Sequence, residues 1–229
     1  MPNFRTIISL LLVVNSIIFL LTACTPSTSV NPISSKSPRF RQGHEFRLIQ
    51  PPQTVEQTDN RIEVVEMFFY ACPHCYSLEP KLAAWRKENK NLINFKRIPA
   101  ILGPSWAEQA RAYYIAEKLA ILDSIHPALL KAIHKNKRQF YNKHSLMKFF
   151  KEQGIAEQIF NKTYHSPEIA EKLNYARIMT VKYKLHGVPA VIINGKYKTA
   201  PFYVKSQEKM LQVIDYLITR ERTLPAFQR

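Results

Sequence analysis

Cysteine is scarce in this sequence. The 229 residues contain three, Cys24, Cys72 and Cys75, and no second closely spaced pair. This excludes a fold held by several disulfides, and a bridge between Cys72 and Cys75 would close too small a loop to add much stability. It also argues against a structural zinc site, which usually takes four ligands. We therefore expect the close pair to act chemically.

Acidic residues are also few. The chain has 33 Lys and Arg against 17 Asp and Glu, a formal net charge of +16. We interpret most of this charge as a solvated surface, with attraction of anionic lipid headgroups or acidic client chains as the functional alternative. The basic residues match no nucleic-acid recognition motif, so no nucleic-acid partner is expected. One concentration comprises Lys131, Lys135, Lys137, Arg138, Lys143, Lys148 and Lys151.

The first 23 residues have the pattern of an export signal. Arg5 precedes an apolar stretch from Ile7 to Leu21, and Thr22-Ala23 leads into Cys24. This resembles a bacterial lipoprotein signal peptide, which implies lipid attachment at Cys24 and a mature chain in the periplasm. An ordinary signal peptide or an uncleaved anchor is the alternative, although the stretch barely spans a bilayer. Lipidation would leave only the close cysteine pair as free thiols.

Alternating strand and helix patterns predict an α/β fold. The nearly continuous apolar run 62–69 predicts a buried strand, a helical pattern follows the cysteine pair, and 94–99 predicts a strand paired in parallel. Helical patterns then begin at Ser105, where a capping box is predicted, and again at Ser145 and Ser166.

The last part of the sequence returns to strand. Ala190 to Ile193 predicts a strand, and Asn194-Gly195 predicts a tight hairpin turn. An amphipathic helix from Ser206 to about Thr219 follows. The sequence therefore predicts a sheet interrupted by a helical segment.

The motif Cys72-Pro73-His74-Cys75 stands where the strand pattern gives way to a helix. A cysteine at such a junction has its sulfur near free backbone N–H groups and the positive end of the helix dipole, which favour the thiolate. We predict that Cys72 is the nucleophile and that Cys75, one turn further in, is shielded and thiol-like. A partly cationic His74 would stabilise the thiolate further, and stabilising the reduced form makes the disulfide a stronger oxidant.

Three segments carry a family resemblance: Val64 to Phe69, Cys72 to Tyr76, and Gly187-Val188-Pro189-Ala190. Together they resemble the DsbA-type thiol oxidases of the thioredoxin superfamily. The match continues through Asn194-Gly195-Lys196-Tyr197 and covers most of the chain after residue 45. The resemblance implies a thioredoxin fold with an inserted helical domain and no tightly bound cofactor.

The resemblance also implies roles for residues outside the cysteine pair. Pro189 is expected to be cis and to face the disulfide, and Val188 to offer its backbone to an extended client chain. Pro73 is an accessory residue of the motif. The expected division is a signal peptide at 1–23, a flexible tether at 24–43, thioredoxin-fold parts at 44–104 and 166–222, a helical insertion at 105–165 and a C-terminal tail at 223–229.

Glu66 lies within the apolar strand, where an unpaired carboxylate is costly. Burial would push it toward the neutral form and make it a plausible proton partner for Cys75. An incidental, solvated or paired glutamate is the alternative. Glu79 with Lys96 or Arg97 is a further candidate for a charged pathway, without an assigned role.

These features predict a periplasmic, lipid-anchored, monomeric thiol:disulfide oxidoreductase that donates its Cys72–Cys75 disulfide to reduced, unfolded exported proteins. The resemblance implies reoxidation by a DsbB-like membrane quinone reductase. Thr25 after Cys24 favours the outer membrane by resemblance to enteric sorting rules, with the inner membrane as the alternative.

A specialised reductase or an isomerase is the second enzymatic interpretation, although residues 25–45 are too few and too polar for the N-terminal dimerisation domain of DsbC-type isomerases. A metal-binding module is a third, but the remaining histidines show no ligand spacing and are interpreted as surface or capping residues. They are His44, His126, His134, His144, His165 and His186.

Overall fold

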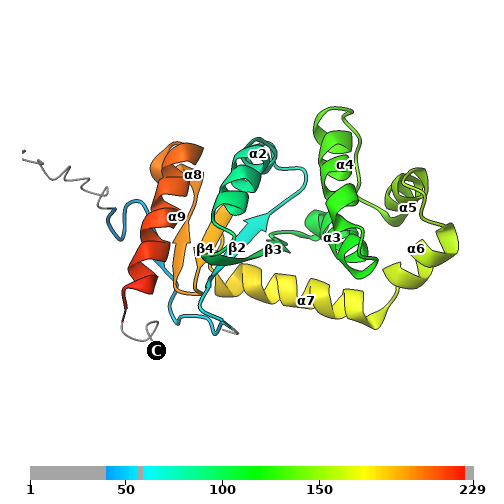
Figure 1. Cartoon of the computed structure of the whole chain (residues 1–229). Helices are drawn as coiled ribbons and strands as arrows, with labels where there is room; N and C mark the ends of the chain where they lie inside the picture. The colour runs from blue at the N-terminus through cyan, green and yellow to red at the C-terminus, as the bar shows by residue number, and fades with distance from the viewer. Residues whose placement is uncertain (1–39, 56–58, 225–229) are drawn as a thin grey trace, which may run out of the picture. The chain divides into compact units, whose positions relative to one another are not determined.

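The computed structural model describes residues 40–55 and 59–224, whose strands form one mixed sheet (Figure 1). The signal segment, Cys24 and most of the predicted tether lie outside the described residues. The strand order is β1 (Arg47–Leu48), β5 (Tyr197–Thr199), β4 (Ala190–Ile193), β2 (Ile62–Phe68) and β3 (Ile93–Pro99). β2 is central and buried along its whole length, parallel to β3 and antiparallel to β4. The two strands that the sequence predicts at 62–69 and 94–99 are both present, as β2 and β3.

The helices follow the order expected for a sheet with an inserted helical segment. The first, α2, directly follows the cysteine loop, and α3 to α7 separate β3 from β4. The bounds are α2 (Pro73–Glu88), the short 3₁₀ helix η2 (Pro104–Trp106), α3 (Ala107–Lys118), α4 (Leu122–His134), α5 (Lys143–Glu152), α6 (Glu157–Tyr164), α7 (Pro167–Lys182), α8 (Pro201–Val204) and α9 (Gln207–Arg222).

The two faces of the sheet belong to two different apolar clusters. Val64 faces the cluster that contains Leu82 of α2 and Leu217 of α9. Its neighbour Val65 faces the cluster that contains Ile115 of α3 and extends into the helical insertion. Successive side chains of a strand point to opposite faces, so a fully buried β2 requires cover on both sides.

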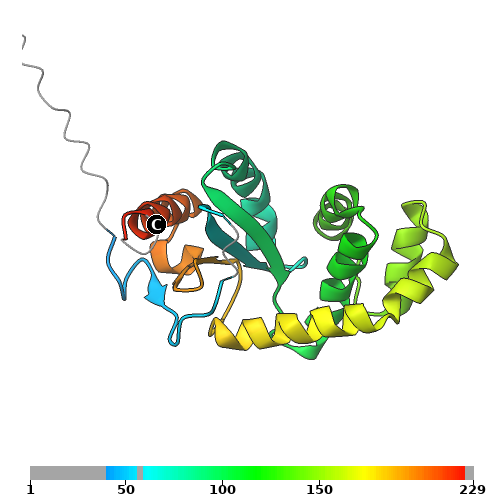
Figure 2. The same cartoon turned by 60° about the horizontal axis from the view of Figure 1, so that its bottom comes forward.

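The helical insertion and the sheet share one apolar cluster. Leu129 of α4 and Phe149 of α5 belong to the same cluster as Met67 of β2 and Cys75 of α2. Figure 2 shows α7 running from the insertion back to the sheet. The predicted boundary between 165 and 166 falls between α6 and α7.

Two helix starts differ from the sequence prediction. The capping box at Ser105 is wrong, because Ser105 lies inside η2 and no side chain caps α3. The chain turns into α3 through the 3₁₀ helix instead. Ser145 does not begin α5 either: Asn142 is the N-cap, and its side-chain oxygen accepts a hydrogen bond from the Ser145 N–H at 2.9 Å. Ser206 does cap α9, accepting from the Lys209 N–H at 3.0 Å.

The β4–β5 hairpin turns at Asn194-Gly195, as predicted. Both residues have positive φ, 50° and 62°, as a two-residue type I′ turn requires. A side chain at Gly195 would also collide with the backbone oxygen of Gln53. The turn therefore needs glycine for both its conformation and its packing.

The described residues from 40 to 43 fall in the range 24–43 that the sequence predicts as tether, and they pack on the domain. Phe40 is buried, and its ring meets the Tyr216 ring of α9 edge-on, with centroids 5.6 Å apart. Gln42 forms a bridge with Phe46. Burial of a large aromatic side chain stabilises this start of the domain.

Candidate active site

The two cysteines lie at the start of α2, at the carboxyl end of the central strand. β2 ends at Phe68, and a short loop leads to Cys72, the N-cap residue of α2. Pro73 occupies the first helical position, where its missing N–H costs nothing. The Ala71 N–H donates to the side-chain oxygen of buried Gln109 in α3 at 3.0 Å. The insertion therefore holds the loop that presents Cys72.

The Cys72 thiol is acidic. Its pKa is lowered to about 6, chiefly by a hydrogen bond from the Cys75 thiol and, against the opposing effect of burial, by the backbone N–H groups of Cys75 and His74 and the charge of His74. The His74 side chain is exposed. Free N–H groups in the first helical turn stabilise the thiolate, as predicted for this junction.

Cys75 has the opposite character. Its side chain is 3% exposed, and burial raises the pKa of the thiol well above its ordinary value, with further increases from Cys72 and from the charge of Glu66. Cys72 and Cys75 are both free thiols in this structure. The pair therefore consists of one thiol that ionises easily and one that keeps its proton.

Val188 lies against Cys72, and Pro189 follows it in the chain. The Cys72 thiol donates to the Val188 carbonyl oxygen, with Sγ and O 3.5 Å apart. The Val188–Pro189 peptide bond is cis, and Pro189 is buried immediately before β4. The expected cis bond is present, and the backbone of Val188 lies beside Cys72; that Pro189 itself faces the disulfide stays a prediction.

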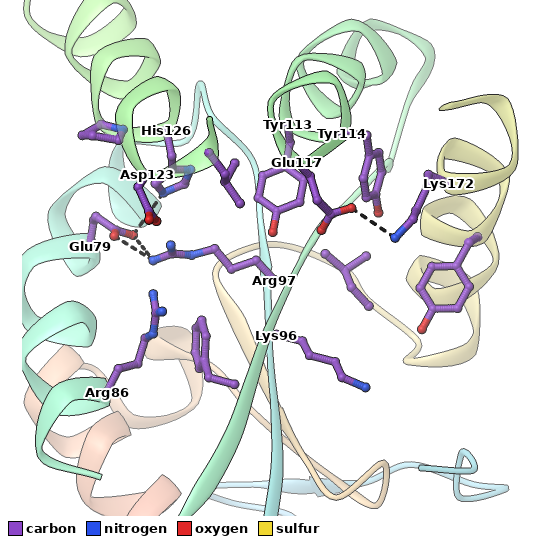
Figure 3. Close-up of a pocket in the computed structure, with 15 residues that line it drawn as sticks. Glu79, Arg86, Lys96, Arg97, Tyr113, Tyr114, Glu117, Asp123, His126 and Lys172 are labelled. Carbon is purple, nitrogen blue, oxygen red and sulfur yellow. Dashed lines mark hydrogen bonds and ion pairs between the residues drawn. The ribbon is translucent and has the colours of Figure 1, made fainter. Parts of the chain in front are cut away.

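Glu66 is buried in β2 and is paired. Its Oε2 lies 2.7 Å from Arg97 Nε. The same guanidinium also pairs with Glu79, as Figure 3 shows, and Arg97 Nη2 and Glu79 Oε2 lie 2.6 Å apart. Burial raises the pKa of Glu66, and the Arg97 charge opposes this increase. The same two glutamates keep the pKa of Arg97 above its ordinary value despite burial. Glu66 is therefore paired, and Arg97 links it to Glu79, the residue named with Lys96 or Arg97 as a candidate for a charged pathway.

Comparison with known proteins gives the family. The model of the DSBA-like thioredoxin domain matches residues 93–215. The thiol:disulfide interchange protein DsbA of Burkholderia cepacia is 34% identical over 176 residues, 77% of this chain and 83% of the relative. That of Pseudomonas aeruginosa is 30% identical over 203 residues, covering 89% and 96%.

Solved structures of DsbA proteins support the same family. The crystal structure of P. aeruginosa DsbA superposes with a TM-score of 0.75 at 31% identity, covering 80% of this chain and 95% of that one. Xylella fastidiosa DsbA gives 0.74 at 31% identity, covering 82% and all of that chain. The chain belongs to the DsbA-like thioredoxin family.

As a DsbA-like protein, the chain is a thiol:disulfide oxidoreductase, and the predicted fold and enzyme class are confirmed. The family model begins at β3, after the cysteine motif. The roles of Cys72 and Cys75 therefore depend on their own geometry and acidity.

Two histidines of this DsbA-like site differ from their predicted surface or capping roles. His126 of α4 is 5% exposed; its Nδ1 lies 2.9 Å from the Tyr70 hydroxyl, and its Nε2 lies 3.4 Å from Glu79 Oε2. His134 Nε2 lies 2.7 Å from the Tyr70 carbonyl oxygen, and its ring stacks on Tyr76. The sequence offers one signal for His126, which lies beside the apolar positions of an amphipathic helix.

Among residues 40–55 and 59–224, no three His, Cys, Asp or Glu side chains are arranged to hold a metal ion. Within the same ranges, no helix combines the length and apolar character that crossing a bilayer requires. Cys24 lies outside these ranges.

Proposed function

We propose that the oxidised protein donates its Cys72–Cys75 disulfide to reduced, unfolded exported proteins. A client thiolate attacks Cys72 Sγ, the Cys72–Cys75 bond breaks, and Cys75 leaves as a thiolate that takes up a proton. A second client thiolate then attacks the client sulfur of the mixed disulfide, and Cys72 leaves as a thiolate. The client gains a disulfide, and the protein retains the two electrons.

The observation that carries this proposal is the opposite acidity of the two thiols. With a pKa of about 6, Cys72 is mostly thiolate at neutral pH, and this stabilises the reduced form relative to the disulfide. Cys72 is also the better leaving group of the pair, because Cys75 has a raised pKa. Both differences favour transfer of the disulfide to the client.

Val188 provides the backbone position at which a client is proposed to bind. Its carbonyl oxygen lies next to the Cys72 sulfur, which the client first attacks and which later leaves. An extended client segment paired with this backbone would therefore bring its cysteine close to Cys72. Pro189 fixes the start of β4 behind it. We assign Val188 and Pro189 to client binding and His74 to stabilising the Cys72 thiolate.

Glu66 is proposed as the proton partner of Cys75. Its charge contributes to the raised pKa of the Cys75 thiol, and its own carboxyl pKa is raised by burial. A carboxyl group whose pKa is raised by burial holds a proton more readily than an ordinary glutamate, and a proton passed from it would ease protonation of the leaving Cys75 thiolate.

The location and partners are part of the same proposal. The sequence 21–24 supports export and a lipid at Cys24, which would keep a monomeric enzyme at a periplasmic membrane surface. A DsbB-like quinone reductase would then reoxidise the pair. Labelled fatty acid should be incorporated into the full chain and not into the Cys24→Ala variant, and equal labelling of both would contradict lipid attachment there.

A redox measurement tests the proposed direction of transfer. The folded domain equilibrated with glutathione should show a potential closer to the about −120 mV of a strong oxidant than to the about −270 mV of thioredoxin. It should also oxidise a reduced client faster than it reduces insulin. A thioredoxin-like potential without oxidase activity would overturn the proposal.

A further inference from the structure

A cavity of about 370 Å³ lies at the β1–β5 edge of the sheet, and its lining is cationic and aromatic. The polar and aromatic lining residues include Arg47, Lys184, His186, Lys198, Phe202 and Tyr203, and none of the lining residues is acidic. A cavity with charge of one sign favours a ligand of the opposite sign.

Two of the three formal cations of this cavity are held by neutral groups. Lys198 is 6% exposed, and its Nζ donates to the carbonyl oxygens of Tyr183 and Lys184 just after α7. Arg47 Nη1 donates to the His44 carbonyl oxygen at 3.0 Å. These contacts fix the positions of Lys198 and Arg47 without neutralising them.

Among the residues that the structure describes, no carboxylate is ion-paired with these cations. Within the described part of the chain, the ion pairs involve neither Arg47, nor Lys184, nor Lys198. Burial lowers the pKa of Lys198, and the charges of Arg47 and Lys184 lower it further, as expected for cations that lie close together. The lining therefore leaves positive charge uncompensated.

The segment 186–188 links the lining of the cavity to the residue that contacts Cys72. His186, which lines the cavity, lies two residues before Val188, whose carbonyl oxygen contacts Cys72. Phe202 is 57% exposed, and its ring lies against Gly187, 3.9 Å from the position of an added Cβ. A polypeptide bound beside Val188 can therefore continue over Phe202 to the cationic lining.

We infer that this cavity is a client subsite that selects an acidic side chain near the cysteine being oxidised. The inference deepens the proposed disulfide donation and rests on it. The occupant is a segment of a reduced exported polypeptide that carries Asp or Glu a few residues from its cysteine. Because an extended chain advances about 3.3 Å per residue, the acidic side chain would reach the level of His186 two or three residues from that cysteine.

The test compares short peptides that have one cysteine and differ at a single position. The oxidised folded domain is mixed with peptides carrying Glu, Gln or Lys, scanned from one to five residues on each side of the cysteine, and mixed-disulfide formation is timed. At one register, the Glu peptide should react about fivefold faster than the Gln peptide at low salt, with Lys slower still. This preference should fall toward one at about 1 M salt, where charges are screened over about 3 Å.

Charge reversal in the cavity should remove the preference. In the Arg47→Glu/Lys184→Glu variant, the Glu-to-Lys rate ratio should fall to one or below. The milder Arg47→Gln/Lys184→Gln variant should reduce it partly. The matched control is Lys148→Glu/Lys151→Glu on α5, across the helical insertion from β1, which makes the same change in net charge (Figures 1 and 2). It should keep the ratio of the unmodified domain.

The outcomes separate this inference from the proposed function. If the unmodified domain forms no disulfide in a peptide that carries two cysteines, disulfide donation itself fails. If the Gln peptide reacts and Glu gives no advantage at any register, only the acidic subsite is overturned. An equal loss of preference in the α5 control would assign the effect to net charge and overturn the subsite. Cavity-dependent binding of anionic phospholipid vesicles, without peptide preference, would overturn it in favour of lipid.

Discussion

Cys72 Sγ lies 3.5 Å from the Val188 carbonyl oxygen, although 116 residues separate the two in the chain. The contact joins the start of α2 to the segment that leads into β4, so the reactive sulfur and the Val188 backbone occupy one place. A client bound along this edge would present its own sulfur to Cys72. Substitutions around Cys72 can therefore test the proposed disulfide exchange.

Replacing Cys75 should trap the client. In Cys75→Ala, Cys72 keeps its position at the start of α2 but has no partner to displace the client, so mixed disulfides should accumulate. The variant is mixed with a client whose cysteine is already linked by a disulfide to a small thiol, which leaves when the Cys72 thiolate attacks. Non-reducing gels and mass spectrometry then measure the mixed disulfide. Cys72→Ala is the control and should form none. Trapping through Cys75 in that control would reverse the assigned roles.

The stability of the reduced form should depend on pH. The Cys72 pKa is depressed to about 6 in the folded protein, so its contribution is present above the unfolded thiol's ordinary pKa near 9.0 and is lost as pH falls through about 6. The difference between a pKa of 9.0 in the unfolded chain and about 6 in the folded protein corresponds to about 4 kcal/mol of stability. Solvent screening of the partly exposed thiolate should reduce this contribution to about 2 kcal/mol.

Thermal unfolding at pH 5 to 9 checks this dependence. The midpoint of the reduced form should rise relative to that of the oxidised form as pH increases, because the oxidised form has no Cys72 thiolate. Cys72→Ser should remove the dependence. A reduced form that gains no relative stability above pH 6 would contradict the low pKa.

Glu66→Gln should change the pH profile of disulfide exchange. Removing the Glu66 charge removes one of the influences that raise the pKa of the Cys75 thiol. The rate profile for mixed-disulfide formation should therefore move to lower pH. Stopped-flow fluorescence with a fixed reduced peptide measures it.

Glu63→Gln is the matched control for this prediction. Glu63 lies on the same strand, is 7% exposed, and pairs with Lys96 at 2.6 Å. It is three positions from Glu66 and so points to the other face of the sheet. A profile that is identical in Glu66→Gln and the unmodified protein would exclude a role for Glu66 in proton transfer.

Arg97→Met should be strongly destabilising. The substitution leaves the carboxylates of Glu66 and Glu79 without their shared guanidinium, and losing one partner of a buried ion pair costs about 3–5 kcal/mol. Urea unfolding of the reduced protein measures the change. Arg138→Met, which breaks an exposed pair with Glu152, should cost less than about 1 kcal/mol.

A double substitution separates charge from packing at this site. Arg97→Met/Glu66→Gln should recover part of the stability lost in Arg97→Met, because one uncompensated carboxylate is removed. No recovery would mean that Arg97 acts through the packing of its side chain and not through its charge.

The features that the sequence predicts well are local or repeat at short intervals. The apolar run of β2, the Asn194-Gly195 turn and the capping serine at 206 each carry their signal in adjacent residues. The helix starts near 105 and 145 are less accurate, because a 3₁₀ turn and an alternative cap, Asn142, compete with the serines.

The features that the sequence does not predict join distant segments. Glu66, Arg97 and Glu79 come from β2, β3 and α2, and their pairing depends on strand register, which places Glu66 opposite Arg97. His126 reaches Glu79 only because α4 packs beside α2. The sequence offers Glu66, Glu79 and either Lys96 or Arg97 as candidates. No spacing within a single element encodes which of them pair, so the pairing becomes visible only in the folded chain.

The apolar cluster shared by the insertion and the sheet affects how the protein can lose its structure. Because Phe149 and Leu129 of the insertion belong to the same cluster as Met67 and Cys75, neither part can open fully without exposing the apolar surface of the other. We therefore expect the Cys75 thiol to become accessible only when the sheet and the helical insertion unfold together. The insertion thus covers part of the core that the sheet alone would leave exposed to solvent.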